Sequence, residues 1–321
     1  MDSVNCYKQA GKIAADVREI ARKKYHVGST LFHICESLEA EIRQRGAAPA
    51  FPVNVSLNDV AAHYTAEPED QIVVNDADVL KIDIGVHIQG YIADTAVTVC
   101  YNPKYEALVK SAETALNEAV RIARVNTKAS DIGKVIEHII SKQGYRPIQN
   151  LSGHALEQYT IHAGKSIPNI WTIGSSFTLV SNQAYAIEPF VTTKDGQGVV
   201  YEGGVRNIFG MTSRKPTSDK DVNEFLEDIW NRFKTLPFAL RWMLDKYEEK
   251  KANQNNGVFA TFTQTCFSST KDDSRTDGQI CYYGQINDIV EISYGSYVES
   301  SFVMFDVRWC KALDNIQRYG Y

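Results

Sequence analysis

The chain has 321 residues, 44% hydrophobic and 23% charged, which is the composition of an ordinary globular protein. Its net charge of −5 and pI of 5.8 argue against a nucleic-acid or anionic-membrane partner. Six scattered cysteines without a CxxC pair disfavour a thiolate zinc site or a disulfide framework. Because the sequence shows neither a secretory signal nor an apolar run of roughly 20 residues, we expect a cytoplasmic protein without membrane partners.

The first part of the chain predicts helices followed by an extended segment. Apolar residues recur at helical spacing over residues 4–24 and 30–45. Residues 50–60 are expected to be extended, because Pro52 disfavours helix for the residue before it.

Residues 79–99 consist of two apolar runs joined by a short turn, which is the pattern of a β-hairpin. If the turn centres between Ile88 and Gln89, Asp83 and Asp94 face each other directly, with Cβ atoms roughly 5 Å apart. Like charges placed so among apolar neighbours need a proton or a cation. The pattern therefore predicts half of a two-metal site, and a coincidental pair of solvent-exposed aspartates is the alternative.

The second part of the chain mixes helices and strands. Helices are predicted at residues 105–123, 129–143 and 219–247. Residues 250–279 are polar and weakly patterned, which is typical of a loop-rich insertion. Residues 286–307 alternate apolar and polar side chains, which predicts two strands. Without a regular βαβ alternation, this order favours an α+β fold.

Four further ionisable residues lie in apolar, strand-like stretches. His154 and His162 are eight residues apart, and even spacing on an extended segment directs both rings to one face. Glu188 precedes a proline at the end of one such stretch, and Glu299 lies within another. The imidazole of His154 and four carboxylates suit a pair of divalent transition ions. The four carboxylates are those of Asp83, Asp94, Glu188 and Glu299. Taken singly, each residue also fits a structural histidine or a solvated strand face, so spacing alone leaves the ligand set open.

Eight short motifs favour one family, because they occur in its order and approximate spacing. The chain resembles methionine aminopeptidase of type 2, in its short archaeal-like form, from the N-terminus to about Trp242. The resemblance weakens over residues 250–285 and resumes loosely around Glu299. The motifs are Ala50-Phe-Pro-Val-Asn-Val-Ser, Ala61-Ala-His-Tyr-Thr, Lys81-Ile-Asp-Ile-Gly-Val-His, Ile92-Ala-Asp-Thr-Ala, Asn150-Leu-Ser-Gly-His, Ile161-His-Ala-Gly-Lys, Tyr185-Ala-Ile-Glu-Pro-Phe and Leu236-Pro-Phe-Ala-Leu-Arg-Trp.

The resemblance implies the pita-bread fold of creatinases and aminopeptidases, in which two pseudo-symmetric halves surround a curved antiparallel sheet. Residues 1–205 and 284–321 would form the catalytic domain, and residues 206–283 the helical insertion of type 2 enzymes. The implied activity is the hydrolytic removal of methionine from nascent proteins and peptides with a small second residue. A monomer acting on nascent chains is expected, and the ribosome stays open as a partner.

The family's metal centre can be placed on this sequence residue by residue. Asp83 would bind one divalent ion through both oxygens, and His154 and Glu188 would hold the second ion. Asp94 and Glu299 would bridge the two ions, which could be cobalt, manganese, iron or zinc. A water between the ions would be the nucleophile, and Glu188 would take its proton.

The family's substrate-contacting residues have counterparts here as well. His63 and His162 match two histidines that contact the substrate near the scissile amide. Phe51 and Ile161 match positions that line the apolar pocket for the flexible methionine side chain. A pocket tyrosine expected near the end of the insertion could be Tyr282 or Tyr283.

The sequence departs from the family around the last ligand. Where the family usually reads Phe-Glu-His-Thr, this chain reads Val298-Glu299-Ser300-Ser301. Glu299 is the best match, but its assignment has weaker support than those of the other four ligands.

Two other functions share the fold. A prolidase or Xaa-Pro aminopeptidase carries the same ligand types, but usually has a domain ahead of the sheet, whereas the first ligand here is already at residue 83. A metal-free relative could serve as a ribosome- or RNA-binding module. The five candidate ligands, the acidic balance and the lack of a lysine-rich tail disfavour that reading.

Overall fold

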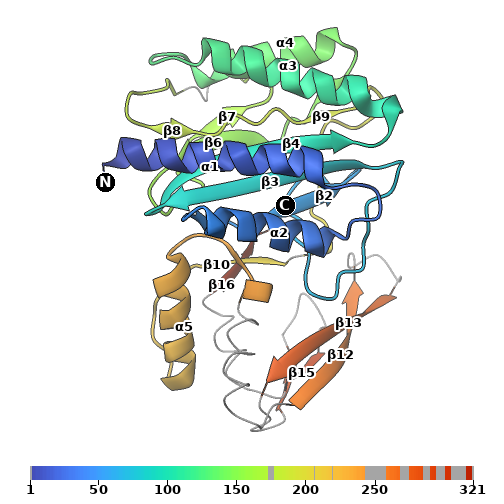
Figure 1. Ribbon diagram of the computed structural model, residues 1–321, viewed down its shortest axis with the longest axis vertical. Helices are drawn as coiled ribbons and strands as arrows, with labels where there is room; N and C mark the ends of the chain where they lie inside the picture. The colour runs from blue at the N-terminus through green and yellow to red at the C-terminus, as the bar shows by residue number, and fades with distance from the viewer. Residues whose placement is uncertain are drawn as a thin grey trace. The chain divides into compact units, whose positions relative to one another are not determined.

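A computed structural model describes residues 2–172, 177–205, 207–218 and 220–242, and the backbone of five later strands (Figure 1). The chain divides into two compact units. The first unit consists of residues 1–66, 70–203 and 321, and the second of residues 67–69 and 204–320. The predicted division into a catalytic domain and a 206–283 insertion stays a prediction.

The two N-terminal helices form where the apolar spacing predicts them. α1 spans Ser3–Lys24 and α2 spans Leu31–Gln44. Asp2 and Thr30 are their N-caps, and each side chain accepts a hydrogen bond from a backbone N–H of the first turn. The buried faces of both helices belong to the same hydrophobic core.

That core lies against an antiparallel sheet, and Figure 1 shows α1 running along the two long strands. The central strand β3 pairs with β4 on one edge and with β1 and β2 on the other. Every second residue of β3 from Leu80 to Val86 is fully buried in the core, so that Asp83 points to the opposite face. The strands are β1 (Ala48–Pro49), β2 (Asn54–Leu57), β3 (Val79–Ile88) and β4 (Tyr91–Cys100).

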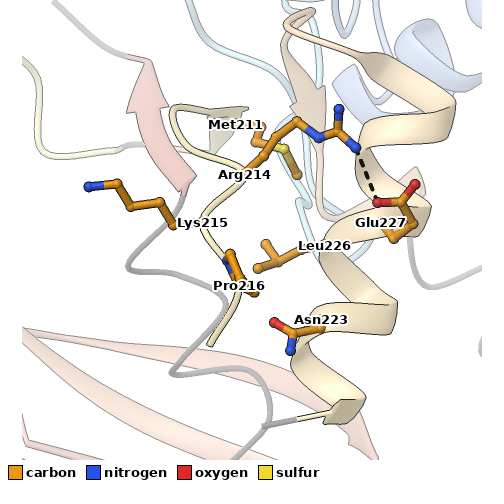
Figure 2. A pocket seen from close by; sticks show the side chains of 7 residues that line it. All are labelled: Met211, Arg214, Lys215, Pro216, Asn223, Leu226 and Glu227. Carbon is orange, nitrogen blue, oxygen red and sulfur yellow. Dashed lines mark hydrogen bonds and ion pairs between the residues drawn. The ribbon is translucent and has the colours of Figure 1, made fainter. Parts of the chain in front are cut away.

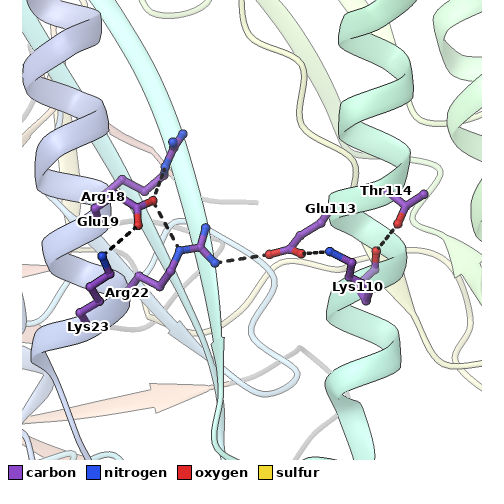
Figure 3. Close-up of polar contacts among 7 residues, drawn as sticks. All are labelled: Arg18, Glu19, Arg22, Lys23, Lys110, Glu113 and Thr114. Carbon is purple, nitrogen blue, oxygen red and sulfur yellow. Dashed lines mark hydrogen bonds and ion pairs between the residues drawn. The ribbon is translucent and has the colours of Figure 1, made fainter.

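Ion pairs connect α1 with α3, which spans Glu106–Ile122 (Figure 3). Arg22 on α1 lies 3.4 Å from Glu113, which also pairs with Lys110. Glu19 completes the network through its contact with Arg22. Since these side chains are 38–71% exposed, each pair contributes only about 0–1 kcal/mol to the free energy of unfolding.

The second half of the first unit repeats the scheme of two helices over short strands. α3 packs beside α4, which spans Ala129–Lys142, and α4 contacts β5 and β7. Ile132, Ile136 and Ile140 form the centre of this second core. The strands are β5 (Arg146–Pro147), β6 (Ser152–Leu156), β7 (Ser166–Pro168), β8 (Ala184–Tyr185) and β9 (Val191–Thr192).

The second unit is organised around a small sheet of order β11-β10-β16. The continuous helix predicted at 219–247 is wrong, because α5 spans Lys220–Phe233 and is followed by a strand; residues 243–247 lie outside the described residues. The chain then bends through Lys234, whose φ is +58°, and Pro237 excludes helix ahead of β11. The strands are β10 (Ile208–Met211), β11 (Phe238–Ala239) and β16 (Ile316–Tyr319).

Residues 250–279, predicted to be a loop-rich insertion, contain one strand and part of a second. β12 (Val258–Phe267) and β13 (Arg275–Gly284) form an antiparallel pair. β12 is rich in aromatic and β-branched residues, which favour a strand and outweigh the polar residues among them. The two strands predicted at 286–307 are confirmed as β14 (Val290–Ser293) and β15 (Ser301–Met304). Among the described helices, none combines the length and apolar character that a bilayer span requires.

Candidate active site

The β3–β4 hairpin turns at Gln89 and Gly90, one residue later than expected. Both residues have positive φ, 52° and 85°, as a two-residue type I′ turn requires. Ile88 therefore pairs with Tyr91 across the ladder. The prediction that centred the turn between Ile88 and Gln89 is wrong, because a non-glycine residue before a glycine fits these positive φ angles better.

The turn shifts the register of the whole hairpin. Asp83 is paired with Ala96, and Asp94 with Gly85, so the predicted direct opposition of the two aspartates is wrong. A shift of two residues keeps both side chains on one face, where they are diagonal neighbours. Their carboxyl groups share a hydrogen bond. Such a bond requires a proton on one of the two carboxyls. The sequence pattern had predicted that this pair needs a proton or a cation.

Burial governs the protonation of this pair. It raises the pKa of Asp83 to about 7, although the hydrogen bond with Asp94 opposes the rise. It also raises the pKa of Asp94 well above its usual range, and the nearby charges of Asp83 and Glu188 add to that rise. The pair therefore retains protons unless a cation replaces them.

β6 and the segment after β8 bring His154 and Glu188 to the same place. The backbone of His154 exchanges two hydrogen bonds with Ala186, at 3.1 and 2.8 Å, and Glu188 follows two residues later. His154 Nε2 lies 3.5 Å from Asp94 Oδ2 and 3.3 Å from Glu188 Oε1. The His154 and Asp94 side chains are only 11% and 13% exposed, whereas Glu188 is 33% exposed. Glu188 is thus more open to a substrate or water than either Asp94 or His154.

His162 joins the site by a different route from the one predicted. The chain reverses at residues 157–160, and the backbone N–H of Ala163 donates to Ala155 C=O at 2.9 Å. A single extended segment carrying both histidines is therefore wrong. The reversal nevertheless places the His154 and His162 rings edge to face, with centroids 4.5 Å apart.

His63 lies within electrostatic reach of the other two imidazoles. Its φ of +62° is unusual for a residue other than glycine. Burial and, to a smaller extent, the proximity of His162 lower the pKa of His63 and of His154 to about 4. Burial lowers the pKa of His162 as well. All three rings are therefore neutral near pH 7, so that each offers one N–H and one lone pair.

The two predicted pocket residues are both buried beside this group. The Phe51 ring occupies the space that a side chain at position 85 would need, since a Cβ on Gly85 would lie 2.3 Å from it. Ile161 forms a backbone hydrogen bond with the His154 ring. Phe51 thus adjoins β3 next to Asp83, and Ile161 adjoins His154.

Four of the five predicted ligands converge, and their chemistry fits a divalent cation. Three carboxyls and a neutral imidazole are hard or borderline metal donors. A cation would offset the cost of ionising the three carboxyls, whose pKa values are raised by burial and mutual proximity. Within the described residues, no three His, Cys, Asp or Glu side chains already surround a common point. The four donors instead contact one another directly.

Two predictions fall wholly or partly outside what the structure describes. The fifth predicted ligand, Glu299, lies outside the described residues. Tyr282 and Tyr283 are paired in β13 with Ala260 and Phe259, which leaves the choice of pocket tyrosine open.

Sequence reasoning missed two residues beside the site. Asn54 is buried, is paired with Asp83 in the sheet and donates from its side chain to Pro52 C=O at 2.6 Å. Gly85 provides the space for the Phe51 ring. An asparagine inside the apolar run of residues 51–57 was a usable signal for the first, whereas nothing in the local sequence predicts that a ring lies over Gly85.

A pocket in the second unit has different chemistry (Figure 2). Its one drawn ion pair, Arg214–Glu227 at 3.3 Å, is more than half exposed. The pocket lining has neither a histidine nor a second carboxylate, so it lacks the donors of the site in the first unit. Its lining residues are Met211, Arg214, Lys215, Pro216, Asn223, Leu226 and Glu227.

Solved structures with a similar fold include several peptidases. A methionine aminopeptidase from Thermotoga maritima matches with a TM-score of 0.54 and 24% identity, over 59% of this chain and 79% of that one. A prolidase from Pyrococcus furiosus matches with a TM-score of 0.53 and 22% identity, over 60% of this chain and 57% of that one. A thermophilic Arx1 matches with a TM-score of 0.65 and 16% identity, over 79% of this chain and 80% of that one. With the family match below, these likenesses confirm the predicted pita-bread fold.

Sequence comparison is more specific. Residues 5–207 match the model of metallopeptidase family M24. The methionine aminopeptidase of Pyrococcus horikoshii is 45% identical over 241 residues, 75% of this chain and 81% of the relative. That of Methanocaldococcus jannaschii is 41% identical over 244 residues, which are 76% of this chain and 82% of the relative. The chain therefore belongs to metallopeptidase family M24 and, within it, to the methionine aminopeptidases, hydrolases that remove N-terminal methionine.

Proposed function

We propose that this aminopeptidase cleaves the first peptide bond of chains that begin with methionine and continue with a small residue. Divalent metal ions held by Asp83, Asp94, His154 and Glu188 would activate the reaction. The observation that carries the proposal is the convergence of three carboxyls and one neutral imidazole beside two further imidazoles.

The cation requirement follows from the electrostatics of the cluster. The carboxyls of Asp83 and Asp94 are hydrogen-bonded and have raised pKa values, and Glu188 lies close enough for its charge to raise the pKa of Asp94. Divalent ions would replace the protons of these carboxyls, and would supply Lewis acidity to the attacking water and the scissile carbonyl. We propose two ions, with Glu299 as the second bridging ligand, as the family resemblance implies.

The remaining side chains have separate tasks. Glu188, which is more exposed than Asp94, would accept the proton of the attacking water. His63 and His162 are neutral near pH 7, so each can donate a hydrogen bond to the substrate amide without adding positive charge beside the cations. Phe51 and Ile161 would form the apolar wall for the methionine side chain.

Peptide hydrolysis tests the specificity directly. The metal-loaded protein should release methionine from Met-Ala-Ser and Met-Gly-Ser, but not from Met-Arg-Ser or Met-Phe-Ser. The reason is that His63 and His162, if they contact the substrate near the scissile amide as the family resemblance implies, would crowd the space beyond that bond. Efficient cleavage of the last two peptides would refute the small-residue preference. Cleavage of Xaa-Pro peptides without methionine would favour the prolidase alternative, which rests on similarity of fold only.

Nascent chains are the physiological substrates that we propose, which places the enzyme in the cytoplasm. Direct ribosome contact is a separate question. Cosedimentation of the purified protein with ribosomes, with and without nascent chains, would distinguish contact with the ribosome from contact with the substrate. A protein that bound ribosomes but never turned over Met-Ala-Ser with any divalent metal would support the alternative of a binding module.

A further inference from the structure

Glu39 is a fully buried carboxylate that the proposed mechanism does not use. It lies on α2, and its Oε1 accepts a hydrogen bond from the backbone N–H of Val53 at 3.0 Å. Its Oε2 lies 3.4 Å from Arg43, one turn further along the helix. Burial of a carboxylate is costly, so an apolar residue would suit a plain packing position better. The bond to Val53 gives the charge a specific partner.

The carbonyl of Val53 is held by side chains as well. The buried hydroxyl of Thr65 donates to it at 2.8 Å, and the thiol of Cys35 does so at 3.2 Å. Backbone groups next to a strand normally bond to a neighbouring strand. Here Glu39 fixes the N–H and Thr65 fixes the C=O of one residue just before β2, which we call the Val53 clamp (Glu39, Val53 and Thr65).

The Val53 clamp joins the two substrate-facing elements of the site. Phe51 precedes Val53 by two residues, and its ring lies against Gly85. His63 precedes Thr65 by two residues, and Tyr64 between them accepts a hydrogen bond from the N–H of Val55 at 2.7 Å. A displacement of Val53 would therefore move the proposed pocket wall and the loop of His63 together.

We propose that Glu39 and Thr65 are positioning residues that set selectivity for methionine at the first position. They fix the distance between the pocket wall at Phe51 and the imidazole of His63. The inference rests on the proposed function, because it takes Phe51 as a wall of the methionine pocket. Neither positioning residue needs to touch the substrate.

The test compares Thr65→Val, which removes the hydroxyl at nearly constant shape, with Thr65→Ser, which keeps it. Glu39→Gln keeps the size but removes the charge, so that the charge-assisted hydrogen bond from the Val53 N–H becomes a weaker neutral one. Thr127→Val is the matched control, because Thr127 also donates its hydroxyl to a backbone carbonyl, that of Ile122 at 2.9 Å, in the other half of the unit. Each metal-loaded variant is assayed with Met-Ala-Ser and with norvaline-Ala-Ser, which has a shorter apolar side chain.

Thr65→Val should raise KM and lower kcat/KM for Met-Ala-Ser about tenfold, and should lower the methionine-to-norvaline ratio about fivefold. Glu39→Gln should shift the ratio in the same direction. Thr65→Ser and Thr127→Val should keep the ratio within about twofold of wild type. If Thr65→Val does not fold, Glu39→Gln decides the test alone.

Wild-type ratios in both Thr65→Val and Glu39→Gln would overturn the inference, as would an equal change in Thr127→Val. A wild-type protein that does not cleave Met-Ala-Ser with any divalent metal would instead refute the proposed function. The two failures are therefore distinguishable.

Discussion

Asp94 meets Asp83 on a diagonal of the β3–β4 ladder, because Asp94 is paired with Gly85 two residues further along the strand. The residue across from Asp94 thus has no side chain, and the Phe51 ring fills the space beside it. One register therefore fixes both the contact between the carboxyls and the position of the pocket wall. The proposed metal centre and the proposed specificity pocket are parts of one hairpin.

Asp94 connects the hairpin carboxyls with the histidines, since it meets both Asp83 and His154. Asp94→Ala should lower turnover of Met-Ala-Ser by about a hundredfold or more and reduce bound metal. Metal analysis of purified protein and kinetics over a range of metal concentrations check both effects. Asp16→Ala, at an exposed position of α1, is the control and should change neither. Near-normal turnover by Asp94→Ala would refute the metal-centre hypothesis.

The stability of the metal-free protein should fall as pH rises from 6.5 to 8.5. Burial raises the pKa of Asp83 to about 7 and raises the pKa values of Asp94 and Glu188 as well. The folded state then holds protons that the unfolded state has already lost, so deprotonation favours unfolding. Urea midpoints in the presence of EDTA measure the slope. Asp94→Asn should flatten it, and saturating Mn²⁺ should abolish it.

The histidines act with the opposite sign at lower pH. Burial lowers the pKa of His63 and His154 to about 4, below the value of about 6.5 in an unfolded chain. The unfolded state therefore binds more protons than the folded state between pH 6.5 and 4. As pH falls through that range, these two residues lower the free energy of unfolding. Because the carboxyls act oppositely there, the range above pH 6.5 isolates the carboxyl contribution. A flat profile from pH 6.5 to 8.5 in EDTA would contradict the raised pKa values.

Gly85→Ala should damage the pocket more than the fold. The new Cβ would lie 2.3 Å from the Phe51 ring, so the ring must move, at a cost of about 1–3 kcal/mol in the free energy of unfolding. We expect a higher KM for Met-Ala-Ser. Gly11→Ala, in the interior of α1 with open space around it, should instead stabilise the protein by about 0.5–1 kcal/mol and leave KM unchanged. Equal KM values in the two variants would show that the Phe51 ring does not line the pocket.

Periodicity predicted the helices and long strands of the first unit well, because each has a buried face with a clear repeat. The register of the hairpin was harder to predict. It depends on which two residues adopt positive φ, and moving the turn by one residue, from Ile88-Gln89 to Gln89-Gly90, changes every cross-strand pair by two residues. Since side chains alternate every two residues, the error left Asp83 and Asp94 on one face and changed only how they meet.

The approach of His162 to His154 could not be predicted from spacing, because it depends on a reversal at residues 157–160. Tyr159 there has a φ of +58°, and its N–H donates to Gly90 C=O at 2.8 Å, a contact distant in sequence. The Val53 clamp was invisible for the same reason. Glu39 and Thr65 meet at Val53 only after α2 has packed on the sheet. The family's motifs named the residues of the site, and tertiary contacts determined their arrangement.

The C-terminal ligand is the last assignment to test, and Glu291 provides a matched comparison. It lies in β14, where its backbone pairs with Val303 of β15. Glu299, eight residues later, is the ligand that the family motif favours despite its altered neighbours. Each residue is changed to glutamine, which keeps the shape and one oxygen but removes the charge.

If Glu299 bridges the metal ions, Glu299→Gln should lower metal affinity and turnover as steeply as Asp94→Ala, because both remove a charge shared by the two ions. Glu291→Gln should change the free energy of unfolding by no more than about 0.5 kcal/mol and leave the rate unchanged. Metal titration and Met-Ala-Ser kinetics on both variants check this. If Glu291→Gln were inactive and Glu299→Gln active, the fifth ligand would be reassigned to Glu291 in β14. If both variants were active while Asp94→Ala was dead, the centre would hold its metal with the four ligands of the first unit alone.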